Sequence, residues 1–476
     1  MAAPTDPTSS SSPDPLPPTG GQAGPGEHAK AKALKGQHAL QAPTGTRDFY
    51  PAELNRLRYI QKAWRDTSIA HGFDEIDGPT FEHLDLYTIK SGEGIVSELF
   101  SFERFGGEKT FALRPEFTPT LARLYAARAS SLPKPTKWFW QQNCFRAERP
   151  QRGRLREFSQ WNCDIIGDDS VTGDAECILT CIAALERMQL RESDVRVRVS
   201  DRTIMNQVLS VCGVDSSGCQ SALNLLDARS KLDNGRFQTG ADALNLDVQT
   251  LDRCLKRIAS VLADKDETIA LDTSAGSVDL SPLWDLREEL AQAGVQTWIE
   301  FDPTITRGLA YYTGMVFEVH EATGAERAIA GGGRYDGLIE LFGGPPTPAV
   351  GFGMGDVVLS LVLQDKGLLP ADDKIADELG LTPDALVVSN GTPEADAQVG
   401  PVLASLRRTK LHARRSYKAT KNVGKLIQEA AKMRARWCVI IESATTAQVK
   451  DMRTQEQVSM GLDELAGRLG GGQAGG

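Results

Sequence analysis

KWFWQQNCFRAERPQRGRLREFSQWNCDIIG, which runs from Lys137 to Gly167, is the stretch that decides the fold. Two runs within it, 138–145 and 157–166, are rich in aromatic and β-branched residues. Pro150 and Gly153 supply turn chemistry between the two runs. The pattern therefore predicts two antiparallel strands that are joined by a long loop.

The second run also predicts a binding site. Strand side chains alternate between the two faces of a sheet, so every second residue of this run lies on the same face. That face carries polar groups among apolar ones, namely Phe158, Gln160, Asn162, Asp164 and Ile166. The loop before it carries Arg149, Arg152, Arg154 and Arg156. Planar guanidinium groups suit phosphate oxygens, so the loop indicates a polyphosphate or RNA ligand. The alternative is a solvated, charged hairpin, but Gln160 and Asp164 are unusual in an otherwise apolar strand.

Length and charge limit the classes of protein. The chain has 476 residues, enough for two or three domains, and a net charge of −10. The charge is uneven, because residues 401–440 hold eleven Lys or Arg and a single acid, Glu429. Such a patch can bind nucleic acid in an acidic protein. Composition alone is equally compatible with a solvated helix face.

The eight cysteines show no paired zinc spacing, so no metal site is predicted. Cys177 and Cys181 are one helical turn apart in an apolar stripe, which is typical of small buried thiols. Reduced thiols favour a cytoplasmic location. We expect no membrane segment, since no apolar stretch has the length of a span, and no secretory signal at the N-terminus.

Composition and periodicity divide the chain into three parts. Residues 1–42, rich in Pro, Ser, Thr and Gly, are expected to form a disordered tail. Residues 43–370 are expected to form an α+β core with a mainly antiparallel sheet flanked by helices, interrupted by a mostly helical insertion at about 191–290. Strands alternate with helices over 384–470, which predicts a small α/β domain.

Four segments of the core supply side chains for one pocket. Acceptors suited to a cation and a small polar group are Glu116, Thr118, Gln160 and Asp164. Arg146, Arg154 and Arg307 suit phosphates, and Tyr311, Tyr312 and Tyr335 offer flat surfaces with hydroxyl groups. These residue types indicate a site for a small amino compound beside a nucleotide.

Four motifs in this order resemble the histidyl-tRNA synthetase family of class II aminoacyl-tRNA synthetases. They are the helix and strand before Pro79; FRAERP at 145–150 with Arg154 and Phe158; RGLAYY at 307–312; and GGRYD at 332–336. The resemblance runs from about Thr44 to about Leu469, and QWN before Asp164, together with Ala310, is most similar to plant-type members. It implies a homodimer formed through the first motif and an anticodon-binding role for residues 384–470.

The resemblance also implies a role for each matching residue. Arg146 would hold the α-phosphate of ATP and the carboxylate of histidine, and Arg307 would stabilise charge during attack, so both are candidate catalytic residues. Glu148, Arg154 and Phe158 would bind the rest of ATP. The histidine site would comprise Glu116, Phe117, Thr118, Arg146, Gln160, Asp164, Arg307, Tyr311, Tyr312 and Tyr335. Gln151 and Arg156 would contact the acceptor end of tRNA(His), and Mg²⁺ would be bound mainly through the ATP phosphates.

The activity implied is formation of histidyl-adenylate from L-histidine and ATP, followed by transfer to tRNA(His). Two alternatives are a regulatory paralogue of ATP phosphoribosyltransferase and a synthetase-like tRNA sensor. Two departures from the family pattern bear on them. The third motif usually ends in an arginine that holds the γ-phosphate, and Val358 stands there. Asp164 also stands where many bacterial members have Glu.

Overall fold

The computed structural model describes residues 40–91, 93–229, 232–263, 270–273, 275–305, 312–418, 420 and 422–470. Its main sheet has eight strands in the order β1 (Asp74–Glu75), β5 (Thr136–Phe145), β6 (Glu157–Ile166), β13 (Ala349–Gly355), β12 (Ala330–Arg334), β11 (Met315–Glu321), β7 (Val195–Asp201) and β10 (Ile299–Phe301). Neighbouring strands are antiparallel except for the two outermost pairs, β1–β5 and β7–β10. This arrangement confirms the predicted α+β fold with a mainly antiparallel sheet.

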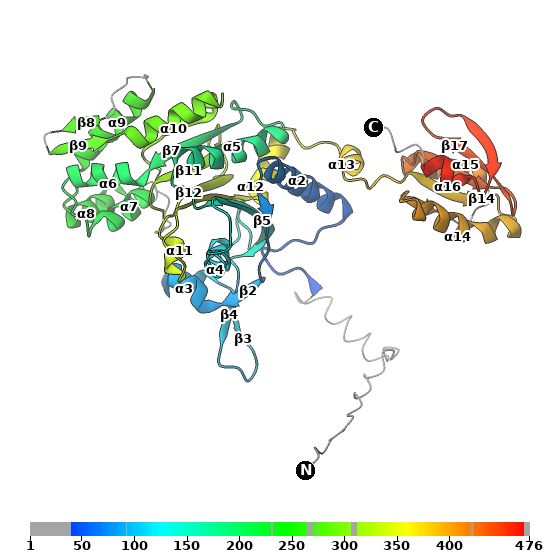
Figure 1. Ribbon diagram of the computed structural model, residues 1–476, viewed down its shortest axis with the longest axis horizontal. Helices are drawn as coiled ribbons and strands as arrows, with labels where there is room; N and C mark the ends of the chain where they lie inside the picture. The colour runs from blue at the N-terminus through cyan, green and yellow to red at the C-terminus, as the bar shows by residue number, and fades with distance from the viewer. Residues whose placement is uncertain are drawn as a thin grey trace, which may run out of the picture.

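Helices pack against this sheet and extend from it (Figure 1). The described helices of this part are α2 (Pro51–Ala70), α3 (Leu84–Ser91), η2 (Glu93–Glu98), α4 (Thr118–Ala126), α5 (Val171–Arg187), α6 (Arg202–Val211), α7 (Cys219–Ala228), α8 (Asn234–Ala243), α9 (Val248–Ala263), α10 (Ser281–Gln292), η4 (Gln296–Trp298), α11 (Leu338–Leu341) and α12 (Asp356–Asp365). Two small sheets accompany them, β2 (Phe81–His83), β4 (Thr110–Leu113) and β3 (Ser101–Glu103) in one, and β8 (Ala270–Thr273) with β9 (Gly276–Asp279) in the other.

The predicted hairpin forms as two ten-residue strands, β5 and β6. Trp161, on one face of β6, stacks on Trp64 of α2 with ring centroids 6.0 Å apart. Trp64 belongs to the apolar stripe of α2, whose first turn begins with Pro51. The faces of β6 therefore divide as the alternation predicts: one is buried under helices, and the other carries the polar side chains.

One strand of the main sheet lies in the segment that the sequence suggests is mostly helical. β7 lies at residues 195–201, between β11 and β10. Its VRVRVSD sequence alternates, with Val195, Val197 and Val199 fully buried. The helices α6, α7, α8 and α9 follow it and gather at that end of the sheet (Figure 1).

The C-terminal part has its own five-stranded sheet, ordered β15 (Ala413–Arg415), β14 (Ala385–Ser389), β16 (Trp437–Ile441), β17 (Thr446–Asp451) and β18 (Gln457–Gly461). Its helices are α14 (Pro393–Arg408), α15 (Val423–Lys432) and α16 (Leu465–Gly470), which confirms the α/β prediction. The connecting helix α13 (Asp372–Glu378) contacts both parts of the chain. Its Asp372 forms an ion pair with Arg56 of α2 at 2.8 Å, and its Asp373 carbonyl accepts from Arg434 of the C-terminal part at 2.6 Å. None of the described helices has the length and apolarity of a membrane span.

Candidate active site

A pocket opens over the polar face of β6. It is lined by Glu116, Thr118, Arg146, Gln160, Asn162, Asp164, Tyr312, Gly331, Tyr335, Gly351, Phe352 and Gly353. Most of these side chains were predicted from four separate segments of the sequence, and the fold brings them together.

Glycines on β13 create the space above the polar side chains. Gly351 pairs with Asp164, and Gly353 pairs with Asn162, in the register of β13 and β6. A Cβ at Gly351 would overlap the Asp164 carboxylate, and a Cβ at Gly353 would overlap the Gln160 amide. The glycines are therefore required by close approach, and the carboxylate and amide face a cavity that larger residues would fill.

Asp164 is held in place by a buried tyrosine. Tyr335 donates its hydroxyl hydrogen to Asp164 Oδ1 at 2.5 Å, and both side chains are buried. Tyr335 follows β12 directly, so its position depends on how that strand ends.

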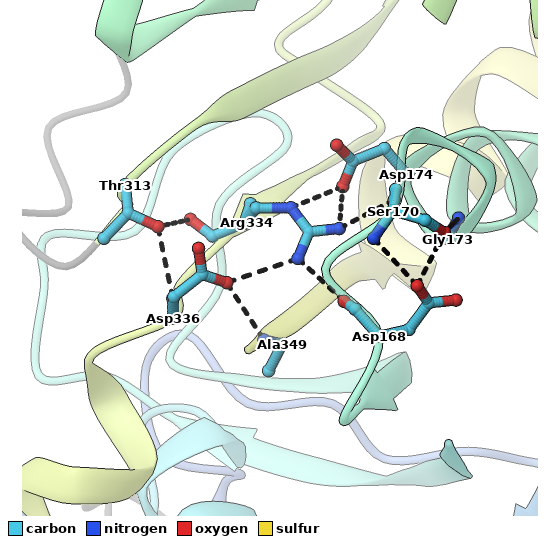
Figure 2. Close-up of polar contacts among 8 residues, drawn as sticks. All are labelled: Asp168, Ser170, Gly173, Asp174, Thr313, Arg334, Asp336 and Ala349. Carbon is cyan, nitrogen blue, oxygen red and sulfur yellow. Dashed lines mark hydrogen bonds and ion pairs between the residues drawn. The ribbon is translucent and has the colours of Figure 1, made fainter. Parts of the chain in front are cut away.

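Arg334 fixes the end of β12 (Figure 2). Its guanidinium donates to Asp174 Oδ1 at 2.9 Å and to the Asp168 carbonyl at 2.8 Å, and it pairs with Asp336 at 3.2 Å. Ser170 caps α5 beside these groups by accepting from the Gly173 amide at 3.3 Å. A buried ion-pair network thus joins β12 to the start of α5 and orients the neighbouring Tyr335.

The two charges of this network respond differently to burial. Burial outweighs the attraction of Arg334 and raises the pKa of Asp174 to about 6. For Arg334, burial acts to lower the pKa, but the carboxylates of Asp174 and Asp336 prevail and raise it. The guanidinium therefore stays charged while its main carboxylate partner titrates near neutral pH.

The pocket also contains the groups predicted to bind an ammonium. Glu116 and Thr118 lie at the start of α4, and both line the pocket with Gln160. Cys144 of β5 donates its thiol hydrogen to Gln160 Oε1 at 3.2 Å, which orients that amide. Burial raises the pKa of Cys144 to about 12, so its sulfur stays protonated and remains a donor.

Guanidinium groups stand at the entrance, on the segment 146–156, which we call the arginine loop. Arg146 donates to the Pro115 carbonyl at 3.1 Å, and its guanidinium lies 5.2 Å from the centroid of the Phe158 ring. Arg154 donates to Glu148 at 2.7 Å. Burial, together with the positive charges of Arg327 and Arg146, lowers the pKa of Arg154. Like charges gathered in one place attract anions.

Some of the predicted site residues take other positions. Phe117 is fully buried and stacks on Trp140 with ring centroids 4.3 Å apart. It therefore packs in the core, whereas its neighbours Glu116 and Thr118 line the pocket. Gln151 is exposed on the arginine loop, whereas Arg156 donates to the carbonyls of Glu148 at 3.1 Å and Thr44 at 3.4 Å. Arg307 and Tyr311 lie outside the described residues.

The structure adds two residues to which the sequence assigned no role in the site. The amide oxygen of Asn162 is buried and has no hydrogen-bond partner among the described residues, so an acceptor is available at the pocket. Its position on the polar face of β6, between Gln160 and Asp164, was the signal that could have identified it. Arg327 is a second addition. It comes from the connection between β11 and β12 and has no motif around it.

The start of α12 lacks the arginine with which the third motif of the family usually ends. Asp356 is fully buried, accepts from the Ser159 amide at 2.8 Å and pairs with Arg47 at 2.7 Å. Burial raises the pKa of Asp356 despite Arg47. Val358, two residues on, points toward Gly153 of the arginine loop. This helix start therefore carries a buried apolar side chain at the position where the third motif of the family usually has an arginine.

The described part of the chain contains no ready-made metal site. No group of three or more His, Cys, Asp and Glu side chains there is arranged to hold a metal ion. A divalent cation at this site would depend on the phosphates of a bound nucleotide for most of its oxygen ligands.

Solved structures of histidyl-tRNA synthetases share this architecture. The fold matches the histidyl-tRNA synthetase of Nostoc sp. PCC 7120 with a TM-score of 0.67 and 23% identity, over 90% of this chain and 98% of that one. It also matches an ATP phosphoribosyltransferase regulatory subunit/histidyl-tRNA synthetase from Bacillus halodurans C, with a TM-score of 0.65 and 22% identity over 85% of this chain and 98% of that one. These likenesses establish the class II synthetase fold.

Sequence relatives define the family. The histidine–tRNA ligase of Opitutus terrae is 40% identical over 71% of this chain and 78% of its own length. The histidine–tRNA ligase of Haloarcula marismortui is 36% identical over 89% of this chain and 96% of its own length. The chloroplastic/mitochondrial ligase of Arabidopsis thaliana is 37% identical over 70% of this chain and 67% of its own length. The family model described as histidyl-tRNA synthetase matches residues 45–355. The chain belongs to the histidyl-tRNA synthetase family, as its motifs predicted, and these curated relatives are aminoacyl-tRNA ligases.

Proposed function

We propose that this protein activates L-histidine with ATP to form histidyl-adenylate and transfers the histidyl group to the 3′ end of tRNA(His). The observation that carries the proposal is the buried Asp164–Tyr335 pair beneath a pocket whose entrance holds Arg146. One end suits a ring with hydrogen-bonding nitrogens, and the other suits a carboxylate and a phosphate.

Specificity for histidine would come from hydrogen bonds. An imidazole ring carries one donor and one acceptor nitrogen in its neutral form. The Asp164 carboxylate accepts from a ring N–H, while Tyr335 and Tyr312 supply hydroxyl groups beside it. A substrate without ring nitrogens would form none of these hydrogen bonds, which is the basis of strong discrimination.

The reaction brings two anions together, so repulsion is its main obstacle. The carboxylate of histidine is already ionised and needs no general base to attack the α-phosphate. Arg146 would neutralise both reactants, and Arg154, released from Glu148, would bind the remaining phosphates. Arg307, outside the described residues, keeps its proposed role at the α-phosphate by family resemblance. Mg²⁺ would enter with ATP and add positive charge.

The C-terminal domain is proposed to bind the anticodon arm of the tRNA. Tyr417 is 88% exposed, and the Arg415 guanidinium lies 5.4 Å from its ring centroid. A cavity of about 380 Å³, lined partly by Arg415 and Lys418, opens near the carboxyl ends of the parallel strands β14 and β15. A flat ring beside cations suits unpaired RNA bases. Glu429 is buried and accepts from Ser416 at 2.6 Å, so the single acid among these residues is largely withdrawn from the surface.

Dimerisation and location are also proposals. The sheet β2–β4–β3 exposes Phe81 and Phe102, which pack edge to face with centroids 5.7 Å apart, and a second copy of the chain would cover them. All eight cysteines are free, in agreement with a reducing, cytoplasmic compartment. Light scattering of the purified protein and fractionation of cells test the two statements.

Histidine-dependent exchange of pyrophosphate into ATP tests the activity, because neither a regulatory paralogue nor a tRNA sensor catalyses it. Asp164→Ala should abolish histidine dependence while ATP still binds, since the change removes only the acceptor for the ring. Asp169→Ala, on the exposed turn after β6, is the matched control and should behave as the unaltered protein. Unchanged histidine affinity in Asp164→Ala would refute the assignment of the pocket.

Deletion of everything after about Pro383 tests the role of the C-terminal domain. Pyrophosphate exchange should remain measurable because the pocket belongs to the main sheet, whereas charging of tRNA should fall by about a hundredfold or more with the loss of RNA contacts. Normal charging by the shortened protein would contradict the proposal.

A further inference from the structure

The connection between β11 and β12, residues 322–329, lies against the tip of the arginine loop. Arg152 pairs with Glu326 at 2.6 Å and thereby joins the two segments. A Cβ at Gly153 would lie 3.8 Å from Arg327 Cδ and 3.4 Å from Val358 Cγ2. Arg327 therefore reaches the same point of the arginine loop as the apolar side chain at the start of α12.

The arginines around this point differ in whether a carboxylate already binds them. Arg152 pairs with both Glu326 and Asp365, and Arg154 pairs with Glu148. Arg327 is exposed and forms no ion pair with any carboxylate in the described part of the chain. Its charge nevertheless acts on Arg154, whose pKa it helps to lower. An uncompensated cation next to a second guanidinium raises the affinity of that place for an anion.

We infer that Arg327 binds the distal phosphates of ATP and supplies the positive charge that Val358 cannot supply from α12. The inference rests on the proposed function, because ATP is the anion involved. Arg146 lines the pocket itself and is therefore assigned to the α-phosphate, which must lie next to the amino acid carboxylate. Arg327 lies beyond it, beside Gly153 and Arg154, where the β- and γ-phosphates would extend.

The arrangement also explains the ion pair between Arg152 and Glu326. Glu326 immediately precedes Arg327, so this contact fixes the backbone that carries the proposed phosphate ligand. The guanidinium of Arg327 stays free to turn toward the nucleotide, while its attachment point remains beside the arginine loop.

Direct binding of ATP and of AMP, measured by calorimetry on the full-length protein, tests the inference without requiring turnover. AMP lacks the distal phosphates, so Arg327→Ala should weaken ATP binding by roughly ten- to hundredfold and leave AMP binding unchanged. Arg327→Lys should recover part of the loss because the charge is restored. Arg236→Ala, which removes an exposed arginine on α8, is the control and should change neither affinity.

Each outcome has one meaning. If Arg327→Ala leaves the ratio of ATP to AMP affinity unaltered, either because neither affinity changes or because both fall equally, the inference is overturned. Absence of histidine-dependent pyrophosphate exchange in the unaltered protein would instead overturn the proposed function. The Arg327 inference fails on binding ratios and the proposed function on exchange, so the two failures are distinguishable.

Discussion

The pocket and the arginine loop are built by opposite means. In the pocket, strand register and buried hydrogen bonds fix Asp164 and Tyr335 before any ligand arrives. On the arginine loop, Arg152 and Arg154 are held by carboxylates that phosphate would have to displace or join. Under the proposed function, recognition of the amino acid would be preorganised, whereas phosphate binding by Arg152 and Arg154 would require an exchange of ionic partners.

This difference has an energetic reason. A buried polar group without a partner costs more than an exposed one, so a ring that completes the hydrogen bonds of this buried pocket would be strongly favoured. Exposed guanidinium–carboxylate pairs contribute little individually because water screens them. They can be broken at small cost when a polyphosphate offers more negative charge.

The most severe test of a rigid pocket is Gly351→Ala. The added methyl group would overlap the Asp164 carboxylate and contact the backbone of β6, which leaves no room for a ring. Histidine-dependent exchange should fall by about a hundredfold or more, because small displacements of reacting groups are this costly. ATP binding by calorimetry should change little.

Gly355→Ala provides the matched control on the same strand, since a Cβ there meets no heavy atom within 4 Å. It should retain exchange activity and fold normally. Equal activity of the two variants would show that the pocket is deformable and that the contrast with the arginine loop is wrong.

A smaller effect is expected from Arg334→Ala, which tests the support of Tyr335. Removal of the guanidinium leaves Asp174 buried without its partner and should cost about 3 kcal/mol of unfolding free energy at pH 8. At pH 5 the loss should be less, because the pKa of Asp174 is about 6 with Arg334 present and rises further without it, so the carboxyl group is neutral. Urea unfolding at both pH values measures this, and a pH-independent loss would contradict it.

The smallest effect is expected from Glu321→Gln at the end of β11. Burial acts to raise the pKa of Glu321, but hydrogen bonds from Thr323 and Lys366 lower it to about 2. The ionised carboxylate therefore stabilises the folded protein above about pH 4.5, and this contribution is lost as the pH falls toward 2. The variant should lose about 1 kcal/mol at pH 7. A thermal unfolding series should show the two proteins converging as the pH is lowered below 4.5.

Local patterns were sufficient to predict the hairpin, the polar face of β6 and helix α2. Each depends on alternation or helical spacing within one short segment, which the tertiary structure reinforces. β7 was missed although Val195, Val197 and Val199 alternate, because helical sequences follow it over most of the next hundred residues. The signal was present but short.

The remaining site residues depend on contacts between distant segments. Arg327 has no motif, and only the approach of the 322–329 connection to Gly153 reveals its position. Arg156, which is predicted to contact the tRNA acceptor end, donates to backbone carbonyls from two segments that its neighbours in sequence do not reveal. Phe117 lies between two pocket residues in sequence, but successive side chains at a strand-to-helix junction point in different directions. Sequence proximity was therefore a poor guide for individual side chains.

The ion pair between Arg47 and Asp356 has a consequence for how the chain is made. Its partners are 309 residues apart, so the ribosome releases Arg47 long before Asp356. At 5 to 20 residues per second, the delay is roughly 15 to 60 seconds. During that interval β6 also lacks its neighbour β13, and the aromatic side chains of the nascent hairpin have no complete sheet to join. The early strands of this protein therefore wait for their partner strands until the last third of the chain emerges.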